Sequence, residues 1–412
     1  TPAPMFLSRW QPYGLYVPRG YDRSRPAQLL LNGHSLDVNH NEYRTASPNQ
    51  LVELGDERRS IVFTPLARGI DTWYLEAGFA DVMEAWRDVL DHYAVDRART
   101  SITGYSMGGY MAYRLGLLMP DRFARASVYV GPPAYGLWAY PLPPSGDDPQ
   151  WTVRGNTNPL VGNALNLPYE IVSGQLDELV PYTSVQHQAD TFKAAGNAYA
   201  LHQHVADDHF SFLLADRWGH TREFLGDARV ERNPVRVRYT RMPSQDLPKY
   251  GLRFDRAYWV SSIEVRDAAT EDATGTVDAT TFGLGGTERV PVASTGPDPE
   301  PVGISPAVVQ RQVLEPGAPI ERRNGFRAAL GNVSGVGFDL RRMGLSPRRG
   351  LTAALTGDGT AKLRLRGRFP RGVRVTVDGA PATFRRARRE LRVIVALAPG
   401  SEHTLRVAPR QR

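Results

Sequence analysis

Apolar residues form two kinds of segment in the first half of the chain, one with helical spacing and one with uninterrupted runs. Between residues 79 and 93 they recur at intervals of three and four, which is the spacing of a helix with one buried face. Around this segment lie short runs rich in leucine, isoleucine and valine, at residues 28–31, 60–63, 101–103, 126–130 and 169–172. Uninterrupted apolar runs of this length predict strands buried on both faces. Such strands, separated by helices, predict an α/β fold with a mostly parallel sheet.

The second half of the chain follows a different pattern, because apolar and polar residues alternate there with a period of two. The clearest runs are residues 235–239, 362–366, 373–377 and 391–397. Alternation predicts strands with one buried face, and the pair Asp378-Gly379 predicts a turn after one of them. We therefore expect an α/β domain in residues 1–227 and an antiparallel β-sandwich in residues 228–412, with the change near residues 232–234.

A short motif joins a predicted strand to a predicted helix. Residues 104–109 read Gly-Tyr-Ser-Met-Gly-Gly. Small residues two positions before and after Ser106 allow the backbone to make a sharp, strained turn close to its neighbours. This pattern is typical of a nucleophile elbow and predicts an exposed serine hydroxyl. The N–H of Met107, at the start of the helix, is the expected donor to an oxyanion.

Two further polar side chains follow later predicted strands. Asp177 comes after the strand at 169–172, and His209 comes after a predicted strand at 198–205. The order serine, acid, histidine, with each residue at a strand end, predicts a catalytic triad. Glu178 is an adjacent carboxylate that competes for the role of the acid. The structural alternatives are a buried turn serine, a helix-capping aspartate and a surface histidine.

On these motifs the chain resembles the α/β-hydrolase superfamily, and within it the prolyl-oligopeptidase-like and feruloyl-esterase-like serine hydrolases. The resemblance rests on residues 104–109, 174–181 and 208–209, with a weaker element at 29–33. It spans about residues 13–226, roughly half of the chain. It implies an α/β-hydrolase fold and a triad of Ser106, Asp177 and His209.

The resemblance also implies a second oxyanion donor. In this superfamily the donor follows a His-Gly pair that ends an early strand. The pair reads Asn32-Gly33 here, so the N–H of His34 is the matching donor, and the N–H of Ser35 is the alternative.

The three residues of the predicted triad allow a two-step acyl transfer. His209 would take the proton of Ser106 as the hydroxyl attacks a carbonyl carbon, while Asp177 orients the imidazole. Water then hydrolyses the acyl-enzyme. We expect a serine esterase that acts on aryl or acyl esters, with polyesters among the candidates. The alternatives are a peptidase of prolyl-oligopeptidase type, since amides use the same triad, and a non-catalytic polymer-binding protein on a hydrolase scaffold.

Aromatic residues gather in segments that are expected to flank the site. Residues 131–168 form a long insert rich in proline and glycine, which predicts a lid or a cleft wall, and the loop at 67–75 emerges from a strand end. Aromatic rings offer large apolar contact with little loss of rotamer entropy. The alternative for each ring is a place in the core. We expect five aromatic residues to bind substrate: Trp73, Tyr74, Tyr105, Trp138 and Tyr140.

No metal or cofactor is expected from the sequence. His202 and His204 point to the same side of a predicted strand, but no third ligand lies near them in the sequence. Residues 37–42 begin like a calcium loop, yet they lack its glycine and its final glutamate. Residues 283–286 lack the lysine and the helix of a phosphate-binding loop.

Charge divides the chain into two unlike halves. Residues 1–227 contain 18 basic and 25 acidic side chains, for a net charge of −7, whereas residues 228–412 contain 32 and 18, for a net charge of +14. The basic half could adsorb to an anionic or polymeric surface, or it could be a solvated face that packs against the acidic half. Nucleic-acid binding is not expected, because no basic motif with interleaved aromatic residues is present.

Composition is that of an ordinary globular protein, with 41% hydrophobic and 23% charged residues in a chain of 412. The sequence contains no cysteine, which excludes disulfides and zinc-thiolate sites, and no apolar run long enough to predict a transmembrane helix. The start Thr1-Pro2-Ala3-Pro4 would suit a mature N-terminus after processing, and with the resemblance it predicts a secreted protein.

Overall fold

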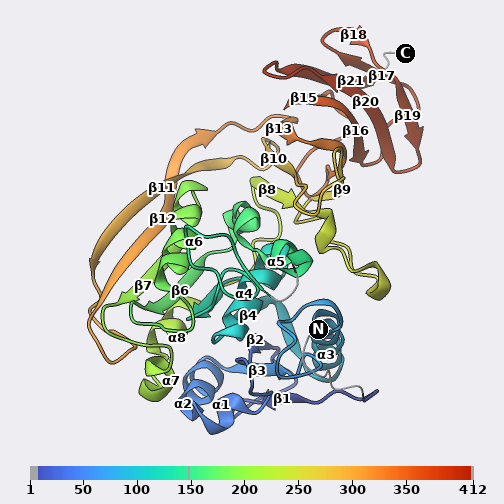
Figure 1. Ribbon diagram of the computed structural model, residues 1–412. Coiled ribbons are helices and arrows are strands. Elements are labelled where there is room, and N and C mark those ends of the chain that lie inside the picture. The colour runs from blue at the N-terminus through green and yellow to red at the C-terminus, as the bar shows by residue number, and fades with distance from the viewer. Residues whose placement is uncertain (1–7, 147–148, 410–412) are drawn as a thin grey trace. The chain divides into compact units, whose positions relative to one another are not determined.

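The chain folds into two compact units (Figure 1). The computed structural model describes residues 8–146 and 149–409, so the Thr1-Pro2-Ala3-Pro4 start lies outside the described residues. The first unit consists of residues 8–230, 247–252 and 291–314, and the second consists of residues 231–246, 253–290 and 315–409. The division therefore differs from the expected one, because the chain returns to the first unit at 291–314.

A nine-stranded sheet runs through the first unit. Its strand order is β1-β3-β2-β4-β5-β6-β7-β12-β11. The six strands from β3 to β7 in this order are parallel to their neighbours, whereas β1 is antiparallel to β3 and β12 is antiparallel to β7. The strands are β1 (Tyr13–Tyr16), β2 (Ala27–Gly33), β3 (Ser60–Pro65), β4 (Val95–Gly104), β5 (Ala126–Tyr129), β6 (Tyr169–Gly174), β7 (Tyr199–His204), β11 (Gly286–Pro297) and β12 (Ala307–Ile320).

The central strands confirm the α/β prediction. All residues of β2, β3, β5 and β6 are buried, because helices cover both faces of a parallel sheet. The five apolar runs of the sequence lie in β2 to β6. The predicted helix at 79–93 corresponds to α3 (Glu76–His92), which buries Phe79, Val82, Trp86 and Val89 along one face. The first unit thus has the α/β-hydrolase fold.

The remaining helices lie between these strands or after β7. They are α1 (Glu42–Thr45), α2 (Pro48–Leu51), the π-helix η1 (Val52–Glu57), α4 (Met107–Leu118), η2 (Pro120–Arg122), α5 (Pro149–Gly155), η3 (Asn158–Asn166), α6 (Tyr182–Ala194), α7 (Ser211–Ala215), α8 (Gly219–Leu225), η4 (Pro243–Gln245) and η5 (Pro248–Tyr250). The insert at 131–168 contains α5 and η3. In the described part of the chain, no helix is both long enough and apolar enough to cross a membrane.

The strands β11 and β12 correct the expectation that residues 228–412 form only a β-sandwich. Residues 307–312 of β12 pair with β7 and so extend the nine-stranded sheet, as Figure 1 shows. Ala307, Val309 and Gln312 are buried, and Gln312 donates to the carbonyl of Asn197 at 2.9 Å. The alternating pattern predicts a strand with one buried face correctly. It does not identify the sheet that the strand joins, because that depends on contacts distant in sequence.

The second unit consists of two sheets that share one hydrophobic core. Their strand orders are β18-β17-β21-β15-β13-β10-β8 and β19-β20-β16-β14-β9. Buried residues from both sheets, such as Phe326, Phe338, Leu363 and Val407, belong to the same cluster. The strands are β8 (Arg236–Arg241), β9 (Val260–Val265), β10 (Gly275–Thr281), β13 (Gly325–Gly331), β14 (Val333–Asp339), β15 (Leu351–Gly357), β16 (Gly359–Arg366), β17 (Val373–Val377), β18 (Ala380–Pro381), β19 (Phe384–Ala387), β20 (Glu390–Leu397) and β21 (His403–Pro409).

Most strand pairs of the second unit are antiparallel, as expected from the alternating pattern. Two pairs are parallel, however, namely β13 with β15 and β14 with β16. The expectation of a wholly antiparallel arrangement is therefore wrong at these two pairs. Alternation reports only that one face of a strand is buried, and it carries no information about the direction of the neighbouring strand.

Candidate active site

Ser106 occupies a strained turn between β4 and α4. Its backbone has φ 53° and ψ −118°, a conformation that L-residues adopt rarely and that costs on the order of 1–3 kcal/mol. The turn passes so close to β2 that a Cβ atom on Gly108 would overlap the carbonyl oxygen of Gly33. A Cβ on Gly104 would overlap the carbonyl of Gly108. Glycine at these positions lets the elbow form and leaves the serine hydroxyl at the sheet edge.

The predicted triad histidine, His209, lies within hydrogen-bonding distance of both Ser106 and Asp177. The Oγ of Ser106 is 2.9 Å from Nε2 of His209, and Nδ1 of His209 is 2.9 and 3.0 Å from the two carboxylate oxygens of Asp177. Because a carboxylate only accepts hydrogen bonds, Nδ1 of His209 carries a proton when Asp177 is ionised. In the neutral imidazole, Nε2 can then accept the serine proton.

The loop after β6 fixes the carboxylate of Asp177. Its Oδ1 accepts hydrogen bonds from the backbone N–H groups of Leu179 and Val180, at 3.0 and 2.7 Å. The competing carboxylate, Glu178, accepts the backbone N–H of His209 at 3.3 Å. The geometry therefore places Asp177 at the imidazole ring and Glu178 at the main chain of the histidine loop.

Tyr105 supports the histidine from the neighbouring elbow. Its hydroxyl donates to the carbonyl oxygen of His209 at 2.5 Å, and its ring packs edge-on against the imidazole. Burial raises the pKa of the Tyr105 phenol well above its ordinary value, so the hydroxyl stays a donor. This bond joins the loop that carries the base to the turn that carries the nucleophile.

A cleft of about 750 Å³ opens above Ser106 and His209. Apolar side chains from several separate segments form much of its wall, including Leu36, Leu137 and Phe210. All three are exposed, and their grouping in one cleft is typical of a surface that binds an apolar ligand.

The five aromatic residues predicted to bind substrate divide into two groups. Trp73 and Tyr105 line the cleft. Tyr74 is fully buried and donates to the carbonyl of His34 at 3.0 Å, so it belongs to the core. This separation of Trp73 from its neighbour arises because consecutive side chains in a loop point in different directions.

Trp138 and Tyr140 do not line the cleft either. Both pack against His187 on α6, with ring centroids 5.3 and 4.0 Å apart. Trp138 is buried, and Tyr140 is partly exposed. The insert therefore contributes to the cleft through Pro132, Gly136 and Leu137 rather than through its aromatic residues.

Glu42 is a cleft residue that the sequence reasoning missed. Its carboxylate accepts the N–H of Ser35 at 2.7 Å and the Oγ of Ser35 at 2.6 Å. Burial raises the pKa of Glu42 to about 7, although the hydrogen bonds from Ser35 oppose this shift. The sequence treats residues 37–42 as an ordinary polar loop, and only the position of Glu42 in the first turn of a helix could have signalled a structural role.

The two predicted oxyanion donors lie on elements that border the serine. Met107 is the first residue of α4, where helix N–H groups lack partners within the helix. His34 directly follows β2, and its buried ring is 2.8 Å from the carbonyl of Ser35 and 3.1 Å from that of Leu66. The alternative donor, the N–H of Ser35, is already bonded to Glu42.

A family comparison agrees with this geometry. Residues 67–221 match the model of the prolyl oligopeptidase family, and this segment holds Ser106, Asp177 and His209. The match indicates a serine hydrolase in residues 67–221. No curated protein matches the sequence.

Solved structures of other serine hydrolases are similar to about half of the chain. An S-formylglutathione hydrolase from Agrobacterium tumefaciens is 18% identical, with a TM-score of 0.41, over 51% of this chain and 85% of the other. The fluorophosphonate-binding serine hydrolase F of Staphylococcus aureus is 17% identical, with a TM-score of 0.41, over 51% and 89%. A ferulic acid esterase is 16% identical, with a TM-score of 0.42, over 51% and 89%.

Proposed function

We propose that this hydrolase cleaves carboxylic esters through an acyl-enzyme on Ser106. The observation that carries the proposal is the line of contacts from Asp177 through His209 to Ser106, which ends in an apolar cleft. An exposed apolar wall favours an aryl or acyl group as the part of the substrate that binds there. Polyesters are candidate substrates because such groups recur along them.

In the proposed mechanism His209 acts first as a base and then as an acid. It accepts the Ser106 proton while Oγ forms a bond to the carbonyl carbon, and it then donates that proton to the departing alcohol. A water molecule next loses a proton to His209 and attacks the acyl-enzyme, which releases the acid and restores the serine hydroxyl. Asp177 stabilises the imidazolium form during both steps.

We assign the oxyanion hole to the N–H groups of Met107 and His34. Negative charge develops on the carbonyl oxygen during each attack, and the N-terminus of α4 carries a partial positive charge that favours it. Removing one such donor typically costs about 3–4 kcal/mol of transition-state stabilisation. Ser35 is not available for this role, since Glu42 holds its N–H.

A peptidase is the second candidate function, because residues 67–221 match a family named for oligopeptidases. The same triad cleaves esters and amides, so the distinction lies in the leaving group. A panel of p-nitrophenyl esters, aminoacyl anilides and a polyester film separates the two. Turnover of anilides with no turnover of esters would overturn the esterase proposal and favour the peptidase.

Labelling tests the nucleophile directly. We expect a fluorophosphonate to label Ser106, and we expect both Ser106→Ala and His209→Ala to prevent labelling while the protein stays folded. Ser127 and Ser173 are buried serines of the same sheet and serve as internal controls in the mass spectrum. Labelling at another serine, or turnover by a folded Ser106→Ala variant, would rule out this mechanism and the non-catalytic scaffold would become the better hypothesis.

We also propose that the second unit is a β-sandwich and that it helps a secreted enzyme adsorb to an anionic or polymeric surface. Three arginines support adsorption, because Arg385, Arg392 and Arg364 are paired in register across β19, β20 and β16. Like charges in one cross-strand row destabilise a sheet, so a bound anion would relieve their repulsion. Glu264 and Glu390 already neutralise part of this charge through contacts at 2.5 Å to Arg364 and Arg392.

A further inference from the structure

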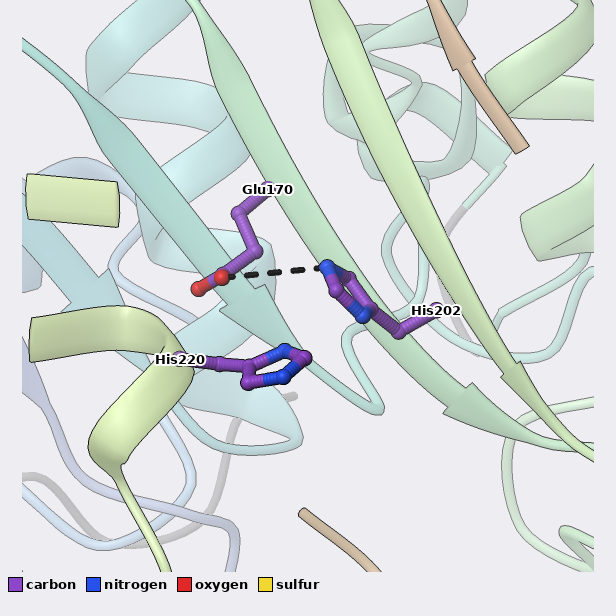
Figure 2. A group of neighbouring side chains, drawn as sticks. All are labelled: Glu170, His202 and His220. Carbon is purple, nitrogen blue, oxygen red and sulfur yellow. Dashed lines mark ion pairs between the residues drawn. The ribbon is translucent and has the colours of Figure 1, made fainter. Parts of the chain in front are cut away.

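Four ionisable side chains meet inside the first unit, outside the catalytic cleft. Glu170 lies on β6, His202 lies on the adjoining strand β7, and His220 lies on α8. One ligand atom from each of these three residues lies within 4.8 Å of the others, and Figure 2 shows the three side chains pointing toward one another. Asp298, from the loop between β11 and β12, contacts both histidines. We call these four residues the buried histidine cluster.

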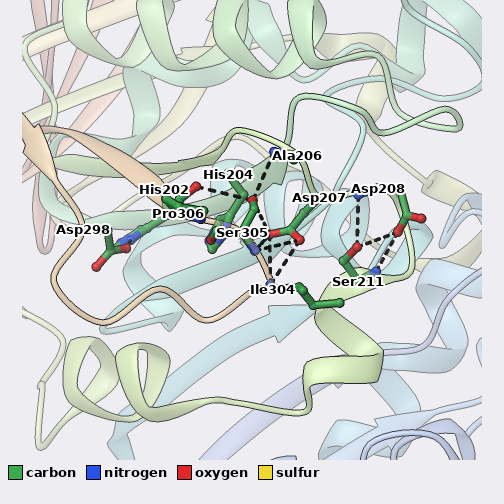
Figure 3. Close-up of polar contacts among 10 residues, drawn as sticks. All are labelled: His202, His204, Ala206, Asp207, Asp208, Ser211, Asp298, Ile304, Ser305 and Pro306. Carbon is green, nitrogen blue, oxygen red and sulfur yellow. Dashed lines mark hydrogen bonds and ion pairs between the residues drawn. The ribbon is translucent and has the colours of Figure 1, made fainter.

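Asp298 determines which nitrogen of each histidine carries a proton. Its carboxylate is 2.7 Å from Nδ1 of His202 and 3.2 Å from Nε2 of His220, and Figure 3 shows it beside His202. Because an ionised carboxylate only accepts hydrogen bonds, both nitrogens are donors. In neutral imidazoles, Nε2 of His202 and Nδ1 of His220 then present lone pairs.

Glu170 presents a third electron pair to the same point. One of its oxygens, Oε2, accepts hydrogen bonds from Ser127 and Thr221 at 2.7 and 2.6 Å. The other, Oε1, faces Nε2 of His202 at 3.9 Å. Two imidazole lone pairs and a carboxylate oxygen repel one another unless a metal ion, an added proton or a water molecule lies between them.

We propose that the buried histidine cluster binds a divalent transition metal ion, with zinc as the best fit. Glu170, His202 and His220 would be the ligands, and Asp298 would orient both imidazoles through their second nitrogens. Two histidines and one carboxylate form a zinc-binding set, and metal-bound histidines typically donate their other N–H to a carboxylate. Zinc ligands at about 2.1 Å in a tetrahedron are about 3.4 Å apart. The 3.9 Å contact must therefore close by about 0.5 Å, and the other ligand pairs, which lie within 4.8 Å, by no more than about 1.4 Å.

Burial favours retention of such an ion. Glu170, His202 and Asp298 are buried, while the His220 side chain is 15% exposed and leaves an approach from the α8 side. The bound ion would connect β6, β7, α8 and the β11–β12 loop. Asp177 follows β6 and His209 follows β7, so the metal would brace the two strands from which the triad loops extend. This inference does not depend on the proposed esterase activity.

No metal is predicted here from the sequence, because no third ligand lies near His202 in the chain. The structure supplies that ligand from another strand and a later helix. It also separates His202 from His204, whose Nδ1 contacts Asp207 at 2.8 Å instead.

Zinc titration of the untagged full-length chain, after treatment with a chelator, tests the proposal. We expect one zinc per chain by elemental analysis and, at about 100 times the dissociation constant, a melting temperature about 5–10 °C higher. Cobalt should give the intense visible absorption of a tetrahedral site. Failure of zinc and cobalt to bind, with histidine NMR signals showing His202 protonated on both nitrogens, would overturn the proposal in favour of an ion pair.

Variants locate the site on the cluster. His220→Ala should abolish the stoichiometric zinc and the cobalt absorption, whereas His187→Ala, which changes a partly exposed histidine on α6, should alter neither. Asp298→Asn keeps all three ligands, so it should weaken affinity about 10–100-fold. It also provides the test if His220→Ala does not fold. Unchanged zinc affinity in either cluster variant would contradict the assignment.

Discussion

The triad and the buried histidine cluster use the same pair of neighbouring strands. Asp177 follows β6 and His209 follows β7, whereas Glu170 and His202 lie within β6 and β7. In both places a carboxylate holds Nδ1 of a histidine, at 2.9 Å from Asp177 and at 2.7 Å from Asp298. The histidines differ in what faces Nε2, which is a serine hydroxyl in the triad and a carboxylate oxygen in the cluster.

This difference teaches that the His–Asp pair alone does not define a function. A hydroxyl can give up its proton to Nε2, so the triad histidine becomes a base beside an open cleft. A carboxylate oxygen has no proton to give, so the cluster histidine becomes a metal ligand or half of an ion pair in a buried place. Substitutions of these histidines and of their carboxylate partners test whether the two sites have separate roles.

The largest effect should come from Asp177→Asn. The amide can donate to Nδ1 and so favours the wrong imidazole tautomer, and we expect kcat to fall about 10⁴-fold with little change in KM. The matched control is Glu178→Gln, which alters the adjacent carboxylate but keeps an oxygen to accept the N–H of His209. We expect that control to retain kcat within about tenfold. Similar losses in both variants would refute the assignment of Asp177 as the sole acid.

His202→Ala should affect stability rather than catalysis. The change leaves Glu170 and Asp298 buried with one fewer partner, and breaking a buried pair typically costs about 3–5 kcal/mol of unfolding free energy. We expect a lower urea midpoint, together with kcat on a small soluble ester within a few-fold of the parent in the folded protein. His209→Ala should have the opposite effects, with a large loss of kcat and little change in the urea midpoint. Loss of turnover in folded His202→Ala would show that the two sites are not separable.

The sequence predicts those strands and site residues whose position in the sheet follows from the residues immediately around them. Strands β2, β3, β5 and β6 are buried on both faces, so their sequences contain mostly apolar residues and are easily recognised. Ser106, Asp177 and His209 were predictable because parallel strands end at one edge of the sheet, which brings distant loops together. The buried position of the Tyr74 ring was not predictable, since the direction of a loop side chain depends on packing contacts that the sequence does not show.

Two features could not be predicted because they depend on contacts between residues far apart in the sequence. They are the position of β11 and β12 in the first unit and the buried histidine cluster. β12 alternates in the same way as the strands of the second unit, and only its pairing with β7 distinguishes it. Glu170, His202, His220 and Asp298 come from four separate elements, and no fixed spacing relates them. Glu42 is similar, because its role appears only when Ser35 is seen beside it.

Glu42→Gln should change the pH dependence of stability. The pKa of Glu42 is raised from 4.5 to about 7 by burial, so its stabilising contribution is complete below pH 4.5 and is lost as the pH rises to about 7. Glutamine stays neutral throughout. Relative to the parent, the unfolding free energy of the variant should therefore increase by about 3 kcal/mol between pH 4.5 and pH 8.

Urea unfolding at several pH values measures this difference. Asp81, whose pKa burial raises to about 6, should give a similar slope to both proteins, so it cancels in the comparison. Parallel stability curves for parent and variant across this range would show that Glu42 titrates normally. A difference confined to pH above 8 would also contradict the prediction.

The smallest effect should come from Arg385→Gln combined with Arg392→Gln in the second unit. Both arginines lie on exposed positions of β19 and β20, opposite each other in register. If this row binds anionic or polymeric surfaces, the double variant should adsorb several-fold less to an anionic film while its turnover of a soluble ester stays the same. The difference should shrink at high salt, because charges are screened within about 8 Å at physiological ionic strength.

A matched Arg9→Gln and Arg19→Gln variant lowers the net charge equally but changes exposed arginines of the first unit. Equal adsorption by the parent and the two variants would show that the arginine row is only a solvated face. Equal losses in the two variants would assign adsorption to net charge rather than to this row. Full-length variants are needed for this test, because truncation at residue 227 would also remove β12 and Asp298 from the catalytic sheet.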